Sequence, residues 1–414
     1  MKRAFVKQVR AGLCFIMLLG VVGVCVVSVG CGRREDPDAL RVVMNLSEEE
    51  WAVMRGQVLP AFTEQTGTRV QAFQVGSGQL ISQLEALVGA GRAEIDLFAQ
   101  DNMSLAALVN RGLVRDLSEY TDQIPAAVPE HLTDAGRFEG KLYFLPFRPN
   151  VQITYFNTRA FAEHGLTPPQ TWAELLTVAR TFYEKEGSGR FVFKGYGSAP
   201  TATQIYEYIL QAGGDPLAFD DEGCVAAFSF LQELGRYFSP ESSRAKWDSM
   251  NEILARQEGY LGQNWPFGVA VLVQQFGLDF IGTYGGWSGP AGRAHVVGGD
   301  VLGIPVNSER VEAALALSAF LQSVEVQEML VRELGWPSIR DDAYGEVPEW
   351  QRPHFASVQD ALKHGVFRKN VAWWPAYQQM VVQAYQQIVL QGEDVQETLT
   401  RLKQQLEDEK GRFE

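Results

Sequence analysis

The side chains that could perform catalysis do not form a recognisable catalytic or metal-binding pattern. Gly286 to Pro290 reads GWSGP, but a proline stands where the nucleophile elbow of serine hydrolases needs its last glycine. The histidines lack metal-site spacing; they are His131, His164, His295, His354 and His364. No glycine fingerprint for phosphates or dinucleotides follows a predicted strand. We therefore expect no enzyme, no cofactor and no metal, while a carboxylate pair for glycoside hydrolysis, which has no spacing signature, stays open.

Planar polar side chains follow a predicted strand. Ile95 to Ala99 is a short apolar run, and Gln100, Asp101 and Asn102 come directly after it. Alternating strands and helices predict an α/β fold with a mainly parallel sheet, whose ligand crevice lies at the carboxyl ends of its strands. Asp101 is equally well explained as the cap of a helix that begins at Met103.

Capping residues and apolar periodicity predict the elements that position these side chains. Ser47 and Glu50 form a capping box, and Gly67 ends the helix that it starts. Thr171 and Glu174 form a second box. Predicted strands are 40–45, 69–75 and 95–99, and predicted helices are 79–90, 103–110, 204–212, 225–237, 310–334 and 377–409.

The size and composition indicate a globular chain with two lobes. Its 414 residues exceed the roughly 250 to 300 at which single cores stop growing. Hydrophobic residues make up 46% and charged residues 21%, which are globular values. The net charge of -14, without any block of Lys and Arg, argues against nucleic acid as a partner.

The first thirty residues have the layout of an export signal. Lys2, Arg3, Lys7 and Arg10 precede an uncharged stretch from 11 to 30. This stretch is also long enough to span a bilayer, so an uncleaved anchor is the alternative.

Cys31 and the residues before it, Ser28, Val29 and Gly30, resemble the lipobox of bacterial lipoproteins. The resemblance implies that residues 1–30 are a signal peptide and that Cys31 receives a diacylglyceride with fatty acyl chains such as palmitate. Residues 31–39 would form a tether. Cys224 is then left without a disulfide partner, and we expect it to be buried and inert.

Several longer motifs resemble the extracellular solute-binding proteins of ABC importers, the branch that includes maltose-binding protein. The most specific is FEGKLYFLPFRPNVQITYFNTRAFAEHGLTPPQTWAELL (138–176), and PAFTEQTGTRV (60–70) and GGDVLGIPVNSERVEAALALSAFLQSVEVQEML (298–330) match other parts of the family. The resemblance implies a two-lobe periplasmic-binding-protein fold, with discontinuous lobes around a ligand cleft joined by a hinge.

The resemblance also places the lobes and the chain crossings between them. We expect an N-terminal lobe of 40–149 plus 299–334 and a C-terminal lobe of 150–298 plus 335–414. The crossings would fall near 149–152, 297–301 and 334–337.

Aromatic and planar polar side chains are the set that binds a sugar, since a sugar offers apolar faces and a ring of hydroxyls. By family position, or by their place at a crossing or in a glycine-flanked loop, we expect these ligand-binding residues: Asp101, Asn102, Arg148, Asn264, Trp265, Tyr284, Trp287, Asp300, Trp373 and Trp374. Which of Trp373 and Trp374 faces the ligand stays open. Thr201, Thr203 and Gln204 are weaker candidates for contacts with hydroxyls.

Arg148 interrupts the apolar run 142–147 at the first crossing. A guanidinium there would suit an anionic ligand such as a sugar phosphate or an organic acid. An ion pair with a cleft acid such as Asp101 is the alternative.

The function expected from the resemblance is that of a monomeric, exported lipoprotein that captures a sugar-like solute and delivers it to ABC permease subunits by hinge closure. It would be attached to a bacterial membrane by its lipid and face the periplasm or the cell exterior. The alternatives are a tethered polysaccharide hydrolase or lyase and a sensory receptor of the same fold.

Overall fold

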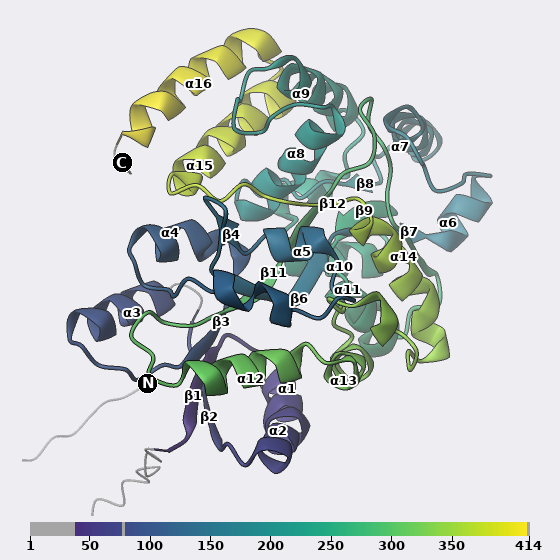
Figure 1. The fold of residues 1–414 in the computed structure, drawn as a ribbon. Coiled ribbons are helices and arrows are strands. Elements are labelled where there is room, and N and C mark those ends of the chain that lie inside the picture. The colour runs from purple at the N-terminus through teal and green to yellow at the C-terminus, as the bar shows by residue number, and fades with distance from the viewer. Residues whose placement is uncertain (1–37, 77–78, 412–414) are drawn as a thin grey trace, which may run out of the picture. The chain divides into compact units, whose positions relative to one another are not determined.

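The computed structural model describes residues 38–76 and 79–411 (Figure 1). The predicted signal peptide, Cys31 and nearly all of the predicted tether lie outside the described residues.

Two β-sheets organise the chain from Asp38 onward. The first has the order β12-β11-β3-β1-β2, with β6 also paired to β11, and the second has the order β10-β7-β9-β8. The first sheet contains β1 Leu40–Met44, β2 Val70–Gln74, β3 Leu97–Asp101, β6 Phe144–Val151, β11 His295–Gly303 and β12 Gly365–Phe367. The second contains β7 Ile153–Asn157, β8 Phe191–Val192, β9 Leu261–Asn264 and β10 Ile281–Tyr284, and β4 Arg137–Phe138 pairs with β5 Lys141–Leu142.

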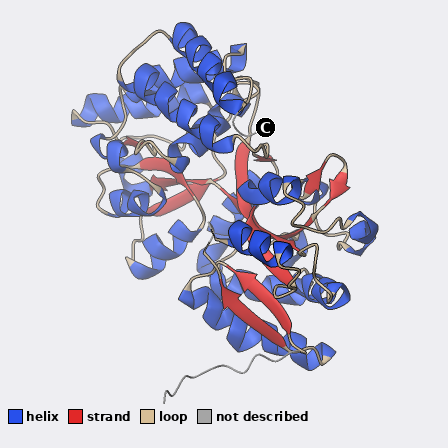
Figure 2. Ribbon diagram, turned by 90° about the vertical axis from the view of Figure 1, so that its left-hand side faces the viewer, coloured by secondary structure: helices blue, strands red, loops and turns tan. Residues whose placement is uncertain are grey.

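Helices cover the sheets (Figure 2). The helices of eight residues or more are α2 Leu59–Thr66, α3 Leu80–Gly89, α7 Trp172–Glu186, α8 Ala199–Gln211, α9 Glu222–Gly235, α10 Trp247–Ala255, α12 Val311–Leu321, α13 Val324–Leu334, α14 Arg352–Leu362, α15 Trp374–Ala384 and α16 Val395–Lys410. The shorter α-helices are α1 Glu48–Val53, α4 Leu105–Asn110, α5 Glu130–Asp134, α6 Thr158–Glu163 and α11 Phe267–Val269. The 3-10 and π turns are η1 Met54–Val58, η2 Asn102–Ser104, η3 Ser118–Gln123, η4 Pro240–Arg244, η5 Ala270–Gln275, η6 Asp341–Ala343, η7 Glu349–Gln351 and η8 Tyr385–Leu390.

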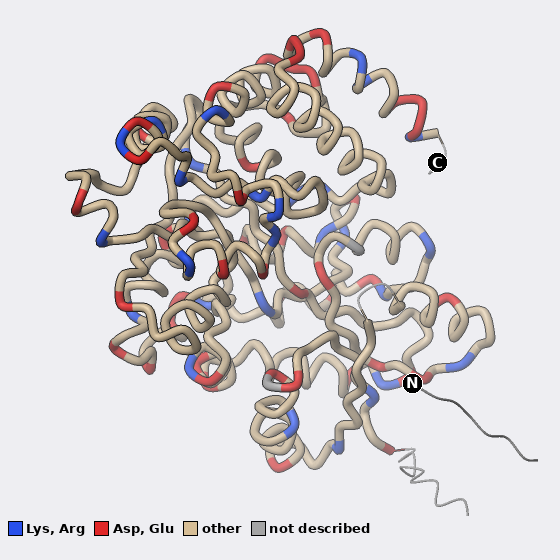
Figure 3. The backbone as a smooth tube through the Cα atoms, turned by 180° about the vertical axis from the view of Figure 1, so that it is seen from behind, with Lys and Arg blue, Asp and Glu red and all other residues tan. Residues whose placement is uncertain are grey.

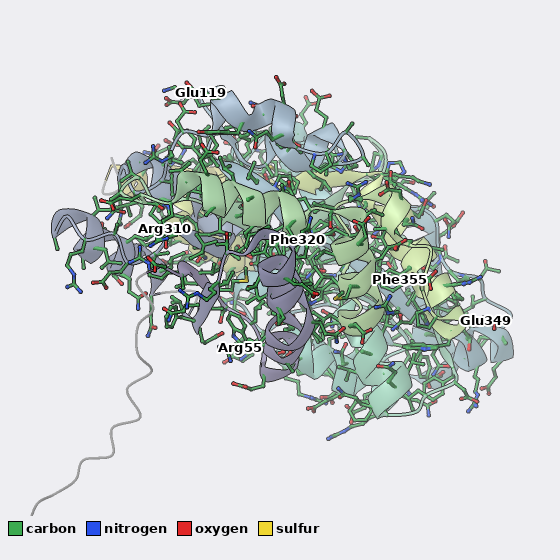
Figure 4. The ribbon with its side chains drawn as sticks, turned by 60° about the horizontal axis from the view of Figure 1, so that its bottom comes forward. Arg55, Glu119, Arg310, Phe320, Glu349 and Phe355 are labelled. Carbon is green, nitrogen blue, oxygen red and sulfur yellow. The ribbon has the colours of Figure 1, made fainter. Side chains whose placement is uncertain are left out.

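Strand β1 has both of its faces buried, which explains why it reads as an apolar run. Val42 packs into a cluster with Trp51 and Phe62 of the helices that follow it. Val43 points to the other face and packs with Leu80 of α3. Helix α12 closes the first face, where Phe320 lies 5.4 Å from Phe62 between ring centroids (Figure 4).

The early strands pair in parallel as expected, but neither sheet is parallel throughout. β1 pairs in parallel with β2 and β3, and β11 with β12, whereas β11 runs antiparallel to both β3 and β6, and the second sheet is mixed as well. The three early strands follow βαβ connections, whereas β11 enters their sheet from a segment far along the chain and in the opposite direction.

Two predicted helices are interrupted. Helices α12 and α13 replace the continuous helix expected over 310–334 and are bent by 60°. The Ser323 side chain accepts a hydrogen bond from the Val326 amide, and this cap starts α13. The helix expected over 377–409 is divided into α15, η8 and α16, with Asp394 capping α16.

The chain passes from the first sheet to the second at Gln152, the residue between β6 and β7. Strand β11 pairs over its first residues with β12 and over its last with β3, and its register against β6 shifts between Asp300 and Val301. Gly299 has φ +108, and a Cβ there would lie 1.9 Å from the Arg148 carbonyl oxygen. Only glycine therefore allows this close approach of the two strands.

Within the described residues, no single helix has the length and apolar character of a membrane span; the bent pair α12 and α13 passes this test only when its two helices are taken together.

Figure 3 shows Lys and Arg interspersed with Asp and Glu along the described chain.

Candidate functional site

Asp101 and Asn102 lie where β3 ends and the 3-10 turn η2 begins. One Asp101 carboxylate oxygen accepts the Met103 amide at 2.9 Å, so Asp101 is the cap considered from the sequence. The Asn102 side chain is completely buried, and neither its amide nitrogen nor its amide oxygen has a hydrogen-bond partner among the described residues. An unpaired buried amide is costly, and the described residues leave both the donor group and the acceptor of the Asn102 amide unused.

Asp300 lies directly opposite Asp101 in the β3–β11 register. The Arg148 guanidinium donates to Asp300 at 2.5 Å and to Glu50 at 2.8 Å, and stacks 4.4 Å from the centroid of Trp336. Burial raises the pKa of Asp300, and the Arg148 charge opposes this shift. The ion-pair interpretation of Arg148 holds, but its partners are Glu50 and Asp300 rather than Asp101.

Trp265 follows β9 directly, and its ring lies against Gly298 of β11. A Cβ on Gly298 would stand 3.2 Å from the Trp265 ring. Because glycine has no Cβ, the indole can pack closely against the β11 backbone. Trp247 packs beside Trp265 with ring centroids 5.2 Å apart, and both indoles are only partly buried. The Tyr155 hydroxyl donates to the Trp265 carbonyl at 2.8 Å and fixes the backbone.

Asn264 makes hydrogen bonds that connect the two segments carrying these indoles. It is completely buried, and its amide nitrogen donates to the Trp247 carbonyl and to the Asn251 side chain, both at 2.8 Å. These contacts make Asn264 a positioning residue for Trp247 and Trp265.

The two late tryptophans have different neighbours. Lys410 lies 4.2 Å above the centroid of the Trp373 ring. Trp374 packs 5.0 Å from Tyr377, and the Arg368 guanidinium lies 5.7 Å from its ring. Trp374 therefore shares the surroundings of Arg368.

Tyr284 and Trp287 are not exposed loop aromatics. Tyr284 is the last residue of β10, and its hydroxyl is buried without a partner among the described residues. The side chain of Trp287, in the loop after β10, is completely buried, and its ring centroid lies 6.0 Å from that of Phe191. Trp287 therefore belongs to the core of the second sheet, because an indole can be glycine-flanked in sequence and still be packed by helices distant along the chain.

Arg368 lies beside the candidate site residues, and the sequence did not reveal it. It directly follows β12 and is 8% exposed; its guanidinium donates to the Thr203 hydroxyl at 2.9 Å. A Cβ on Gly298 would lie 3.8 Å from its Nη2 atom, so Arg368 reaches the same part of β11 as Trp265. These neighbours are distant in sequence, and no local pattern marks Arg368.

A buried polar network lies behind Trp247. The Lys194 ammonium, completely buried, donates to the Gln152 side chain at 2.7 Å and to the Gln263 carbonyl at 2.5 Å, and lies 5.1 Å from the centroid of the Trp247 ring. Burial lowers the pKa of Lys194 to about 7, and the Glu207 charge opposes this shift. The network joins Gln152, at the crossing between the sheets, to the indole pair.

Replacing Lys194 by Met should change how stability depends on pH. The pKa of Lys194 in the folded chain is about 7 against an ordinary 10.5, so between these values the unfolded chain binds more protons and stability rises with pH. Below the folded pKa, Lys194 is charged in both states, and the full free-energy cost of burying its charge is present. We expect the unfolding free energy of the wild type, relative to Lys194→Met, to rise from pH 7 to 9 by up to about 1.4 kcal/mol per pH unit.

Urea unfolding at several pH values measures this difference. Lys185→Met, at an exposed position on α7, is the control and should differ from the wild type equally at every pH. A pH-independent difference for Lys194→Met would show that the ammonium keeps its ordinary titration.

Comparison with known proteins defines the class to which this fold and site belong. The chain belongs to the bacterial extracellular solute-binding protein family, whose family model matches residues 48–328. A Deinococcus radiodurans protein described as a probable ABC transporter-binding protein is 24% identical over 353 residues, which cover 77% of this chain and 81% of its own length.

Solved structures share the fold. The cyclic α-maltosyl-1,6-maltose binding protein of Arthrobacter globiformis has a TM-score of 0.79 at 20% identity, covering 91% of this chain and 100% of its own. The sugar-binding protein MalE of Xanthomonas citri also has a TM-score of 0.79, at 18% identity, covering 90% of this chain and 98% of its own. The predicted fold is confirmed: two α/β lobes around a ligand cleft, joined by a hinge.

Proposed function

We propose that this protein captures a carbohydrate-like solute and delivers it to an ABC permease. The observation that carries the proposal is the group of side chains around β11. Gly298 of this strand packs against the partly exposed Trp265. Asp300 of the same strand lies opposite Asp101, and the next residue, Asn102, has an unpaired amide among the described residues. An indole face and planar hydrogen-bonding groups are the pair of features that a sugar ring needs. The Deinococcus protein is described as a probable ABC transporter-binding protein, and the Arthrobacter and Xanthomonas proteins are described as sugar-binding; these descriptions support the same function.

The mechanism is hinge closure. A solute that touches residues on both sides of the crossings binds the closed state more tightly than the open one and shifts the population toward closure. The proposed lobes are 40–149 plus 299–334 and 150–298 plus 335–414. The permease would then bind the closed form.

Thermal unfolding of the protein with a panel of sugars, sugar phosphates, polyols and organic acids tests this function. A solute at a hundred times its dissociation constant adds about 2.7 kcal/mol to the free energy of unfolding, which raises the melting temperature by a few degrees. We expect a carbohydrate to produce this shift and to be recovered chemically unchanged. A cleaved product would favour a tethered hydrolase or lyase, and a panel without any carbohydrate that binds would contradict the proposal.

The proposal includes a lipid anchor on Cys31, supported by the small residues Ser28 and Gly30 before it and by the apolar stretch 11–30. Cys31→Ser should block acylation and processing, so the chain keeps its signal segment. Metabolic labelling with a radioactive fatty acid measures this, with Cys25→Ser as the matched control that keeps the label. Equal labelling of wild type and Cys31→Ser would contradict the anchor.

A further inference from the structure

Arg368 carries a buried positive charge that no carboxylate of the described residues pairs with. Its Nη1 atom donates to the neutral Thr203 hydroxyl at 2.9 Å, and its buried Nε–H has no hydrogen-bond partner among those residues. Burial lowers the pKa of Arg368, and the charge of Asp101, which lies beyond ion-pair distance, opposes this shift. A guanidinium has five N–H donors, so most of its binding capacity is unused.

Arg148 shows what a neutralised arginine looks like in the same chain. Two carboxylates, Glu50 and Asp300, accept its hydrogen bonds, although its side chain is more exposed than that of Arg368. Burying a cation without an anion costs free energy. Arg368 is more deeply buried than Arg148, yet the described residues supply no acid that pairs with it. This contrast favours an anionic partner from outside the described chain.

The surroundings of Arg368 indicate where this partner lies. A Cβ on Gly298 would lie 3.8 Å from the Arg368 Nη2 atom and 3.2 Å from the Trp265 ring, and the Arg368 guanidinium lies 5.7 Å from the centroid of Trp374. Two partly exposed indoles therefore lie near the cation, and the charge of Asp101 acts on it from beyond ion-pair distance.

We propose that Arg368 binds an anionic group on the solute, so the physiological ligand is an acidic sugar derivative that carries a carboxylate or a phosphate. This inference rests on the proposed function and specifies its substrate class. The flat guanidinium fork matches either group with paired hydrogen bonds, and the bond to Thr203 holds the fork in position.

Calorimetry of the full chain with matched solutes tests the assignment: glucose, glucuronate and glucose 6-phosphate, and galactose, galacturonate and galactose 6-phosphate. We expect at least one acidic member to bind the wild type more than tenfold tighter than its neutral partner. In Arg368→Gln this member should lose affinity by about thirtyfold or more, while any neutral binding stays within threefold. Preference for the uronates or for the phosphates distinguishes a carboxylate from a phosphate. Arg159→Gln removes an exposed positive charge and should leave all six affinities unchanged.

The outcomes separate this inference from the proposed function. Neutral sugars that bind as tightly as their acidic partners, or an acidic preference that survives in Arg368→Gln, would overturn the inference and leave carbohydrate capture in place. No binding by any of the six would contradict the inference, and no binding by any carbohydrate in the wider panel would remove the proposed function as well.

The ligand-free melting temperature gives a second, ligand-independent readout. Because the charge of Arg368 is unpaired, Arg368→Gln should melt at the same temperature as the wild type or a few degrees higher. A decrease of about five degrees or more would show that Arg368 is a structural residue, and would overturn the assignment.

Discussion

Replacing Arg148 by Met should lower the free energy of unfolding by about 3 to 5 kcal/mol, because it leaves two partly buried carboxylates without their cation. Arg148 donates to Glu50 at 2.8 Å and to Asp300 at 2.5 Å, and stacks on Trp336. These four residues come from α1, β6, β11 and the segment after α13, so the cluster joins parts of the chain near all three predicted crossings. Urea unfolding at neutral pH measures the loss.

The deficit of Arg148→Met should decrease as the pH falls from 7 to 5. Burial already raises the pKa of Asp300, and the variant lacks the charge that opposes this shift. A carboxyl whose folded pKa lies above its unfolded value binds more protons in the folded state, so acidification toward that pKa stabilises the fold. A deficit that is constant across this range would contradict the explanation.

Arg159→Met is the matched control for Arg148→Met. Arg159 pairs with Asp279 at 2.6 Å, but the two side chains are 65% and 74% exposed. Exposed pairs contribute at most about 1 kcal/mol. If both variants lose the same stability, the argument from burial fails.

Replacing Trp265 by Ala should weaken solute binding by about thirtyfold or more, equal to about 2 kcal/mol. The indole lies against Gly298 and beside Trp247. Its loss removes apolar contact with the faces of a sugar ring, and Trp265→Phe should recover part of the affinity. Calorimetry with the tightest-binding solute of the panel measures the change.

Trp350→Ala is the control for Trp265→Ala, since Trp350 is 37% exposed and its ring centroid lies 6.5 Å from that of His354 on α14. It should bind solute as the wild type does. Unchanged binding in Trp265→Ala would place the solute elsewhere in the chain.

Local elements could be predicted from the sequence where the cause is itself local. Ser47 and Glu50 form the expected capping box, and Gly67 ends α2 in the left-handed conformation. Cys224 is buried and free, as expected. Capping depends on side chains three residues apart, and burial of a cysteine depends mainly on its residue type.

The features that the sequence did not reveal depend on contacts between distant segments. The bend between α12 and α13 has no proline or glycine to mark it, only the cap at Ser323. Trp287 and Arg368 are of residue types that occur in cores, at surfaces and in sites alike, and their roles depend on which helices and strands surround them. Arg148 faces the carboxylates of Glu50 and Asp300, whereas Arg368 faces the neutral Thr203 hydroxyl, and only the folded structure shows this difference.

The buried thiol of Cys224 has a practical consequence for observing lobe motion. It is the single cysteine of the described residues, it is completely buried, and burial raises its pKa, so it should not react with maleimides in the folded chain. Two cysteines introduced at exposed positions, one in each proposed lobe, would therefore accept a donor and an acceptor dye without background labelling from this part of the chain. Energy transfer between single pairs of dyes could then follow opening and closing as they occur.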